Sequence, residues 1–266
     1  MWRPFAVAAV VAGHVLLVTL LPPDKAEGWS AMAGLLFKAA AAAEGLRAAF
    51  ALGRGDYLRD YWLAMGAAFA MLALADAPAI MGVAGQAASH HPARFLLLVA
   101  GNALSLYGAA RLALAVRSTG LDFEPARRRH LTGAIFVVIA AAVVGAALRR
   151  ELPLALAAHP ERWADVFSYV CDGLVFVLMV PVLRFAVHLG GGRLAGIWWA
   201  LFGANACWLL FDATGALALD SSASGPTLAA GEGFRALACL LTALAAWHQR
   251  DLVASARTAR VAAASA

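Results

Sequence analysis

Residues 131–149 read LTGAIFVVIAAAVVGAALR, an apolar run that follows the basic cluster Arg127-Arg128-Arg129-His130. A helix that crosses a bilayer needs about 20 mainly apolar residues. The whole chain of 266 residues is 63% hydrophobic and 14% charged, whereas soluble domains are about 25% charged. Its mean hydropathy is +0.76. We therefore predict an all-α, polytopic integral membrane helical bundle, and the composition excludes soluble, disordered, collagen-like and disulfide-built classes.

Similar apolar runs, separated by Pro, Gly and charged residues, predict eight membrane spans. They cover residues 4–21, 29–52, 60–84, 94–117, 131–149, 164–189, 195–219 and 228–248. Lys38, Glu44 and Arg47 interrupt the second run, and an alternative with seven spans leaves this helix lying at the membrane interface. Residues 1–250 would then form one transmembrane domain, and residues 251–266 a short cytoplasmic tail.

The Lys and Arg residues predict which side of the membrane each turn faces. The expected even-numbered turns and the two termini hold 12 of them, and the odd-numbered turns hold five: Lys25, Arg94, Arg149, Arg150 and Arg162. Because basic residues collect on the cytoplasmic side, we expect both termini in the cytoplasm of a bacterial-type cell and a multi-pass protein of the inner (plasma) membrane. The cluster 127–129 is then a juxtamembrane anchor and not a nucleic-acid site.

Polar residues inside the spans are the candidates for function, because a charge in the hydrocarbon costs about 2.5–3.5 kcal/mol. Under this topology, four spans place carboxylates in the outer half of the membrane. A polar pocket that opens outward would collect the candidate ligand-binding residues Asp76, Asn102, Asp172, Asn205, Asp212, Glu232 and Arg235. Each single acid also has a simpler interpretation as a packing or helix-capping residue.

The remaining candidate ligands predict no metal or cofactor. Cys171, Cys207 and Cys239 lie in apolar segments without CxxC spacing, which is typical of small core residues. His14 has no second intramembrane histidine as a haem partner, and we expect it to be a core residue. We expect the lipid bilayer as the main partner, with a membrane or cytoplasmic signalling partner and room for a homo-oligomer.

The last three spans carry a resemblance to a known group of receptors. Residues 167–174 read FSYVCDGL, residues 209–212 read LLFD and residues 244–248 read LAAWH. These segments resemble the eight-helix membrane sensor region found ahead of bacterial diguanylate cyclase and histidine kinase modules. Only a short tail follows the last expected span, so the resemblance implies a stand-alone receptor-like module without the output domain, which signals through a partner.

A second resemblance implies an enzyme. Phe37-Lys38, Ala75-Asp76 and Phe211-Asp212 are similar to the Lys-Pro, Gly-Asp and Ser-Asp pairs of the lysoplasmalogenase family, which are eight-helix membrane hydrolases. The resemblance implies cleavage of the vinyl-ether bond of lysophospholipids with Asp76, Asp212 and Lys38 as catalytic residues. Only the charged member of each pair is present here.

The sequence therefore leads to one main functional hypothesis with two alternatives. The main hypothesis is receptor-like sensing or small-ligand binding in the outward-facing polar pocket. The alternatives are the lipid hydrolase and a small transporter or structural subunit of a membrane complex. We expect Asp212 to be the most buried of Asp76, Asp172 and Asp212.

Overall fold

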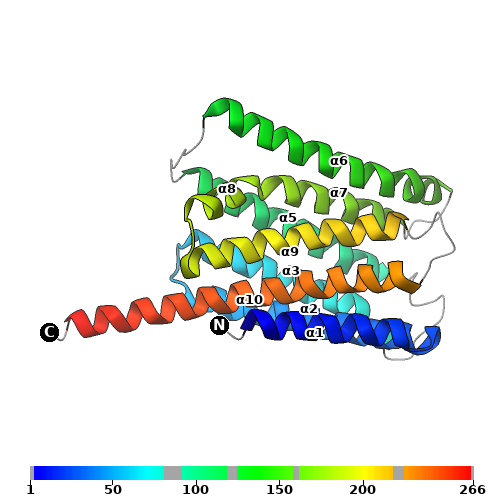
Figure 1. The fold of residues 1–266 in the computed structure, drawn as a ribbon, viewed down its shortest axis with the longest axis horizontal. Helices are drawn as coiled ribbons and strands as arrows, with labels where there is room; N and C mark the ends of the chain where they lie inside the picture. Colours follow the sequence, from blue (N-terminus) through cyan, green and yellow to red (C-terminus); the bar gives the residue numbers. More distant parts are fainter. Residues whose placement is uncertain (1–2, 81–91, 119–124, 158–161, 218–224, 265–266) are drawn as a thin grey trace.

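The chain folds into long helices that run side by side along one common direction (Figure 1). The computed structural model describes residues 3–80, 92–118, 125–157, 162–217 and 225–264. Its helices are α1 (Arg3–Leu20), α2 (Pro23–Ala51), α3 (Tyr57–Ile80), α5 (Pro92–Ser118), α6 (Ala126–Leu156), α7 (Arg162–Leu178), α8 (Val180–His188), α9 (Gly192–Leu217) and α10 (Gly225–Ala264). The predicted all-α architecture is confirmed for these residues.

Seven helical segments of the described residues are long and apolar enough to cross a membrane. They correspond to α1, α3, α5, α6, the pair α7 and α8, α9 and α10. The outer helices carry large apolar side chains on their free surface: Phe5 of α1 is 76% exposed and Val138 of α6 is 67% exposed. An apolar surface of this kind matches a lipid solvent, because lipid tails are as apolar as the side chains.

The second expected span forms a full helix but is not among the seven. At about 1.5 Å per residue, the 29 residues of α2 are long enough to cross a bilayer of about 30 Å hydrocarbon thickness. Two of its charged residues lie against other helices, since Lys38 contacts α3 and Glu44 contacts Arg250 of α10. The opposite face carries exposed apolar side chains, among them Leu36 (59% exposed) and Phe50 (70%). These ion pairs compensate the charges that interrupt the apolar run.

The backbones of α2 and α3 approach each other closely at two glycines, Gly45 and Gly66. A Cβ atom built on Gly66 would lie 2.9 Å from the backbone nitrogen of Leu46, and one built on Gly45 would lie 3.2 Å from the Cα atom of Gly66. Two glycines at the contact therefore allow the helices to approach closely, as small residues do in membrane bundles.

Three helix boundaries differ from the sequence expectation. α6 continues to Leu156, so Arg149 and Arg150 lie within a helix and not in a turn. The expected sixth span is divided at Met179 into α7 and α8, because Pro181 has no N–H group to continue the backbone ladder. α10 extends to Ala264, so that most of the expected tail is helical and projects beyond the bundle (Figure 1).

Both ends of the chain lie at the same end of the bundle (Figure 1). α1, α3, α6 and α9 finish at the opposite end, where α2, α5, α7 and α10 begin. We call this opposite end the hollow end, for the reason given below. Between the two ends, a core of buried side chains that includes Trp62, Phe69, Leu112, Ile197 and Leu201 holds the central helices together.

Candidate functional site

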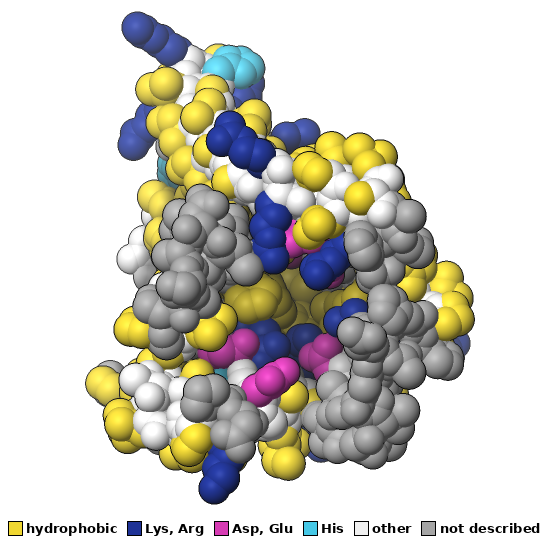
Figure 2. Space-filling model, turned by 90° about the vertical axis from the view of Figure 1, so that its right-hand side faces the viewer, with side chains coloured by type: hydrophobic (Ala, Val, Ile, Leu, Met, Phe, Trp, Pro, Cys, Tyr) yellow, Lys and Arg dark blue, Asp and Glu magenta, His cyan; other side chains and the backbone are white. Residues whose placement is uncertain are grey.

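The hollow end contains a cavity mouth surrounded by charged side chains. Figure 2 looks onto this end and shows a depression with Lys, Arg, Asp and Glu side chains around it and hydrophobic side chains at its floor. The structure therefore combines a polar entrance with an apolar interior, which is the usual composition of a small-molecule site.

The first polar group at this end is an ion pair between α2 and α3. Lys38 Nζ lies 2.5 Å from Asp76 Oδ2, and their side chains are 8% and 21% exposed. Because a buried ammonium group is stable only beside an opposite charge, Asp76 compensates Lys38. The sequence had singled out both residues, although their direct pairing was not expected.

The second polar group joins α1, α2 and α10. Arg235 contacts Glu232 one turn earlier on α10, and it donates hydrogen bonds to the backbone oxygen (2.9 Å) and the Oγ atom (3.2 Å) of Ser30. Glu232 Oε2 also lies 3.7 Å from Nε2 of the buried His14, whose Nδ1 atom accepts a hydrogen bond from Trp29 at 3.1 Å. Arg235 therefore compensates the charge of Glu232.

The absence of a side chain at Gly34 makes room for the Arg235 guanidinium. A Cβ atom at this position would lie 2.8 Å from Arg235 Nη2. Substitution of Gly34 would therefore displace the guanidinium from its contacts with α2.

The third polar group is a pair of carboxyl groups on α7 and α9. Asp172 and Asp212 lie beside each other, and Ser168 lies beside Asp172. Ser168 Oγ in turn lies 3.4 Å from Asn102 Oδ1 on α5, so polar side chains follow one another from α5 through α7 to α9.

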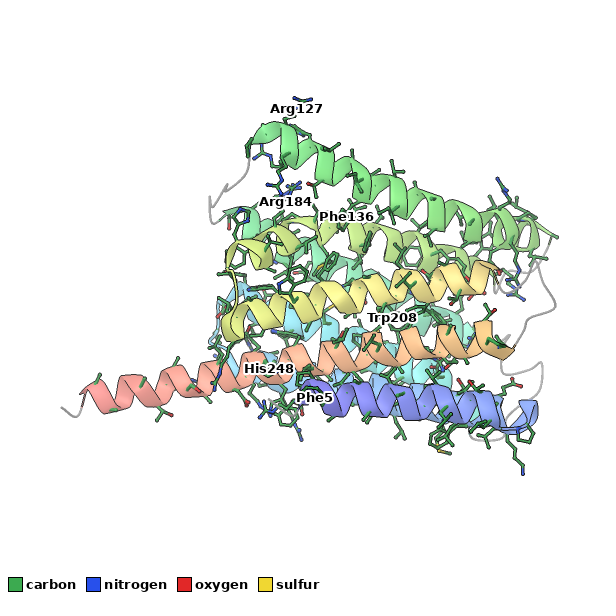
Figure 3. The ribbon with its side chains drawn as sticks, viewed as in Figure 1. Phe5, Arg127, Phe136, Arg184, Trp208 and His248 are labelled. Carbon is green, nitrogen blue, oxygen red and sulfur yellow. The ribbon has the colours of Figure 1, made fainter. Side chains whose placement is uncertain are left out.

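An aromatic contact lies below the carboxyl groups and connects their helices. The ring centroids of Phe69 on α3 and Trp208 on α9 are 6.4 Å apart, and Figure 3 shows Trp208 on α9, away from the helix ends. Asp76 follows Phe69 by seven residues and Asp212 follows Trp208 by four. At about 1.5 Å per residue, both acids lie one to two turns closer to the hollow end, above one aromatic contact.

The structure thus places most sequence candidates at one end, in three separate groups. Asp212 is 5% exposed, while Asp76 and Asp172 are partly exposed, so the expectation that Asp212 is the most buried is confirmed. Asn205 lies outside these three groups. Its amide nitrogen donates a hydrogen bond of 2.7 Å to the backbone oxygen of Leu201 in the same helix. On α10, Cys239 and Thr242 are buried.

Sequence reasoning missed a buried acid at the end of α6. Glu151 is 3% exposed, and its carboxylate lies 3.4 Å from Arg162 Nη1 and 3.5 Å from Arg150 Nη1. The apolar run ends near residue 149, which predicts a turn at Glu151, whereas α6 continues to Leu156. Ser30 and Ser168 were also missed, because isolated serines in apolar helices carry no spacing signal.

The described residues contain no group of three or more His, Cys, Asp and Glu side chains that could hold a metal ion. All three cysteines are free and buried. The three polar groups described above contain carboxyl, ammonium, guanidinium, imidazole and hydroxyl groups. Comparisons with protein-family models, curated proteins and solved structures find no match to this chain.

Proposed function

We propose that this chain is a receptor-like membrane protein that binds a small polar ligand in the hollow and signals through a partner. The observation that supports this function is the gathering of enclosed charged groups at the one hollowed end of the bundle (Figure 2). Ionisable side chains in the apolar phase are costly, and they are stabilising only where they meet each other or a ligand. A polar mouth above an aromatic contact suits a ligand with one charged and one apolar part.

The proposal includes a topology with eight spans and both termini in the cytoplasm of a bacterial-type inner membrane. Two observations support it: the chain termini lie at one end of the bundle (Figure 1), and α2 packs lengthwise between α3 and α10. The distribution of Lys and Arg residues agrees with it. The hollow then opens to the outer side, where a receptor meets its ligand.

The proposed partner contacts the projecting part of α10. This helix extends to Ala264, beyond the other helices at the end that holds the termini (Figure 1). Arg3 Nη1 lies 2.6 Å from Asp251 Oδ2, which connects the start of α1 to this segment. Movement of α10 at the hollow would therefore reach a cytoplasmic partner through one continuous helix.

Ligand screening with a matched pair of tryptophan variants tests the binding function. Purified protein in nanodiscs is screened with a library of small polar compounds, and thermal unfolding is measured for each compound. Compounds that stabilise the native protein should lose this effect in Trp208→Leu, since Trp208 lies below the hollow. They should keep it in Trp199→Leu, because Trp199 is 47% exposed on the same helix. The binding function is refuted if no compound shows this pattern.

The carboxyl groups also favour a second function, the hydrolysis of vinyl-ether lysophospholipids. Two neighbouring carboxyl groups can share a proton and divide the roles of acid and base, and Asp172 and Asp212 lie beside each other. The test is aldehyde release from a vinyl-ether lysolipid by purified protein. We expect no turnover. Aldehyde release that is abolished by Asp212→Asn and by Asp76→Asn, in protein of unchanged thermal stability, would show that the protein is a hydrolase and would overturn the receptor proposal.

A further inference from the structure

We infer that the Asp172 and Asp212 pair is the subsite for a positively charged amine, so that the ligand of the hollow is a small organic ammonium compound. This inference rests on the proposed binding function and adds the chemical class of the ligand. It follows from the lack of a described ion-pair partner for these two acids, from the surroundings of Asp212 and from the aromatic side chains nearby.

The other buried or half-buried acids described near this end have basic partners. Asp76 lies 2.5 Å from Lys38, Glu232 contacts Arg235, and Glu151 lies 3.4 Å from Arg162. Among the residues that the structure describes, Asp172 and Asp212 form no ion pair with a Lys or Arg, and they lie beside each other and Ser168. The pair therefore has no described ion-pair partner.

Asp212 is enclosed, and one of its carboxyl oxygens lacks a partner. The residue is 5% exposed, and its Oδ2 atom is enclosed without a hydrogen-bond partner. An enclosed carboxylate oxygen without a donor loses its hydration and gains nothing in return. An N–H group from a cationic ligand would supply both the missing donor and the missing positive charge.

Aromatic side chains beside the pair favour an organic cation over a metal ion. Trp208 lies one helical turn before Asp212, with its ring 5.9 Å from Phe211 and 6.4 Å from Phe69, measured between centroids. Aromatic faces attract ammonium groups and pack against the attached carbon atoms. A hard metal ion instead requires about six oxygen ligands, and the described group offers two carboxyl groups with Ser168 and Asn102.

Three probes of matched shape and different charge test this inference on the full protein in nanodiscs. The probes are 2-phenylethylamine, 3-phenylpropionate and 2-phenylethanol, and the readout is the dependence of the unfolding temperature on probe concentration. We expect the amine to stabilise the protein with at least about tenfold higher affinity than the other two, because a charge-assisted hydrogen bond is about twice as strong as a neutral one. Asp212→Asn and Asp172→Asn should each remove this preference. Asp165→Asn should keep it, because Asp165 is 39% exposed and already paired with Arg162.

The possible outcomes separate the ligand class from the binding function. Equal or stronger binding of 3-phenylpropionate or 2-phenylethanol overturns the ammonium subsite, while the proposal that the hollow binds a small ligand stands. Failure of the amine to bind, or amine binding that survives both Asp→Asn substitutions, also overturns it. Stabilisation by sodium chloride alone that depends on Asp212 would assign a metal ion in place of the amine. Failure of the binding function itself is recognised separately, by the absence of any library compound that distinguishes Trp208→Leu from Trp199→Leu.

Discussion

Removal of one partner of the ion pair between Lys38 and Asp76 should strongly destabilise the bundle. The Lys38 side chain is 8% exposed and its Nζ atom lies 2.5 Å from Asp76 Oδ2. Asp76→Leu would leave a buried ammonium group without its counter-charge. Removal of one partner of a buried pair costs about 3–5 kcal/mol. Because the Asp76 side chain retains 21% exposure, we expect a loss near the lower limit, about 3 kcal/mol.

A double-mutant cycle separates the unpaired charge from the loss of a contact. Lys38→Met together with Asp76→Leu removes both charges and fills the space with apolar side chains. Such a replacement of a buried ion pair often leaves the free energy of unfolding unchanged. We therefore expect the double variant to recover about 2 kcal/mol relative to Asp76→Leu alone. The free energy of unfolding is measured by titration of the detergent-solubilised protein with sodium dodecyl sulfate, followed by circular dichroism.

A second ion pair on α3 provides the matched control. Asp60 Oδ2 lies 3.0 Å from Arg111 Nη2 at the opposite end of the bundle, and these side chains are 45% and 42% exposed. Exposed pairs contribute about 0–1 kcal/mol, so Asp60→Leu should change stability much less than Asp76→Leu. Equal effects of the two substitutions, or additive effects of Lys38→Met and Asp76→Leu, would refute the argument from burial.

Three further predictions concern packing, topology and thiol access. Gly66→Ala should destabilise the protein by about 1–3 kcal/mol through overpacking, since its Cβ atom would meet the backbone nitrogen of Leu46 at 2.9 Å. Gly133→Ala meets nothing within 4 Å, and a similar loss there would contradict the steric explanation. A cytoplasm-dependent reporter should be active after Ala266 and a periplasm-dependent reporter at Ser222, and the reverse pattern at both sites would overturn the orientation. The three buried cysteines should react with maleimide only after unfolding, so rapid labelling of the folded protein would show that the helices separate.

The sequence alone determined the class of the fold and the position of most helices. Apolar runs of about 20 residues leave the backbone few options other than helix, because each unpaired N–H or C=O group in hydrocarbon costs several kcal/mol. The same cost makes charged residues within these runs conspicuous. For this reason Asp76, Asp172, Asp212 and Glu232 could be named as candidates before their helices were assembled.

Tertiary structure decided which of these groups meet. Hydropathy does not distinguish a helix that faces lipid from one that faces other helices, and the polar helix α2 therefore looked marginal although it packs against α3 and α10. Nothing in the sequence indicates how the four acids are distributed. Asp76 pairs with Lys38 and Glu232 with Arg235, whereas Asp172 and Asp212 lie beside each other without a described basic partner. Those partners depend on the rotation and register of each helix, which are set by contacts between residues far apart in the chain.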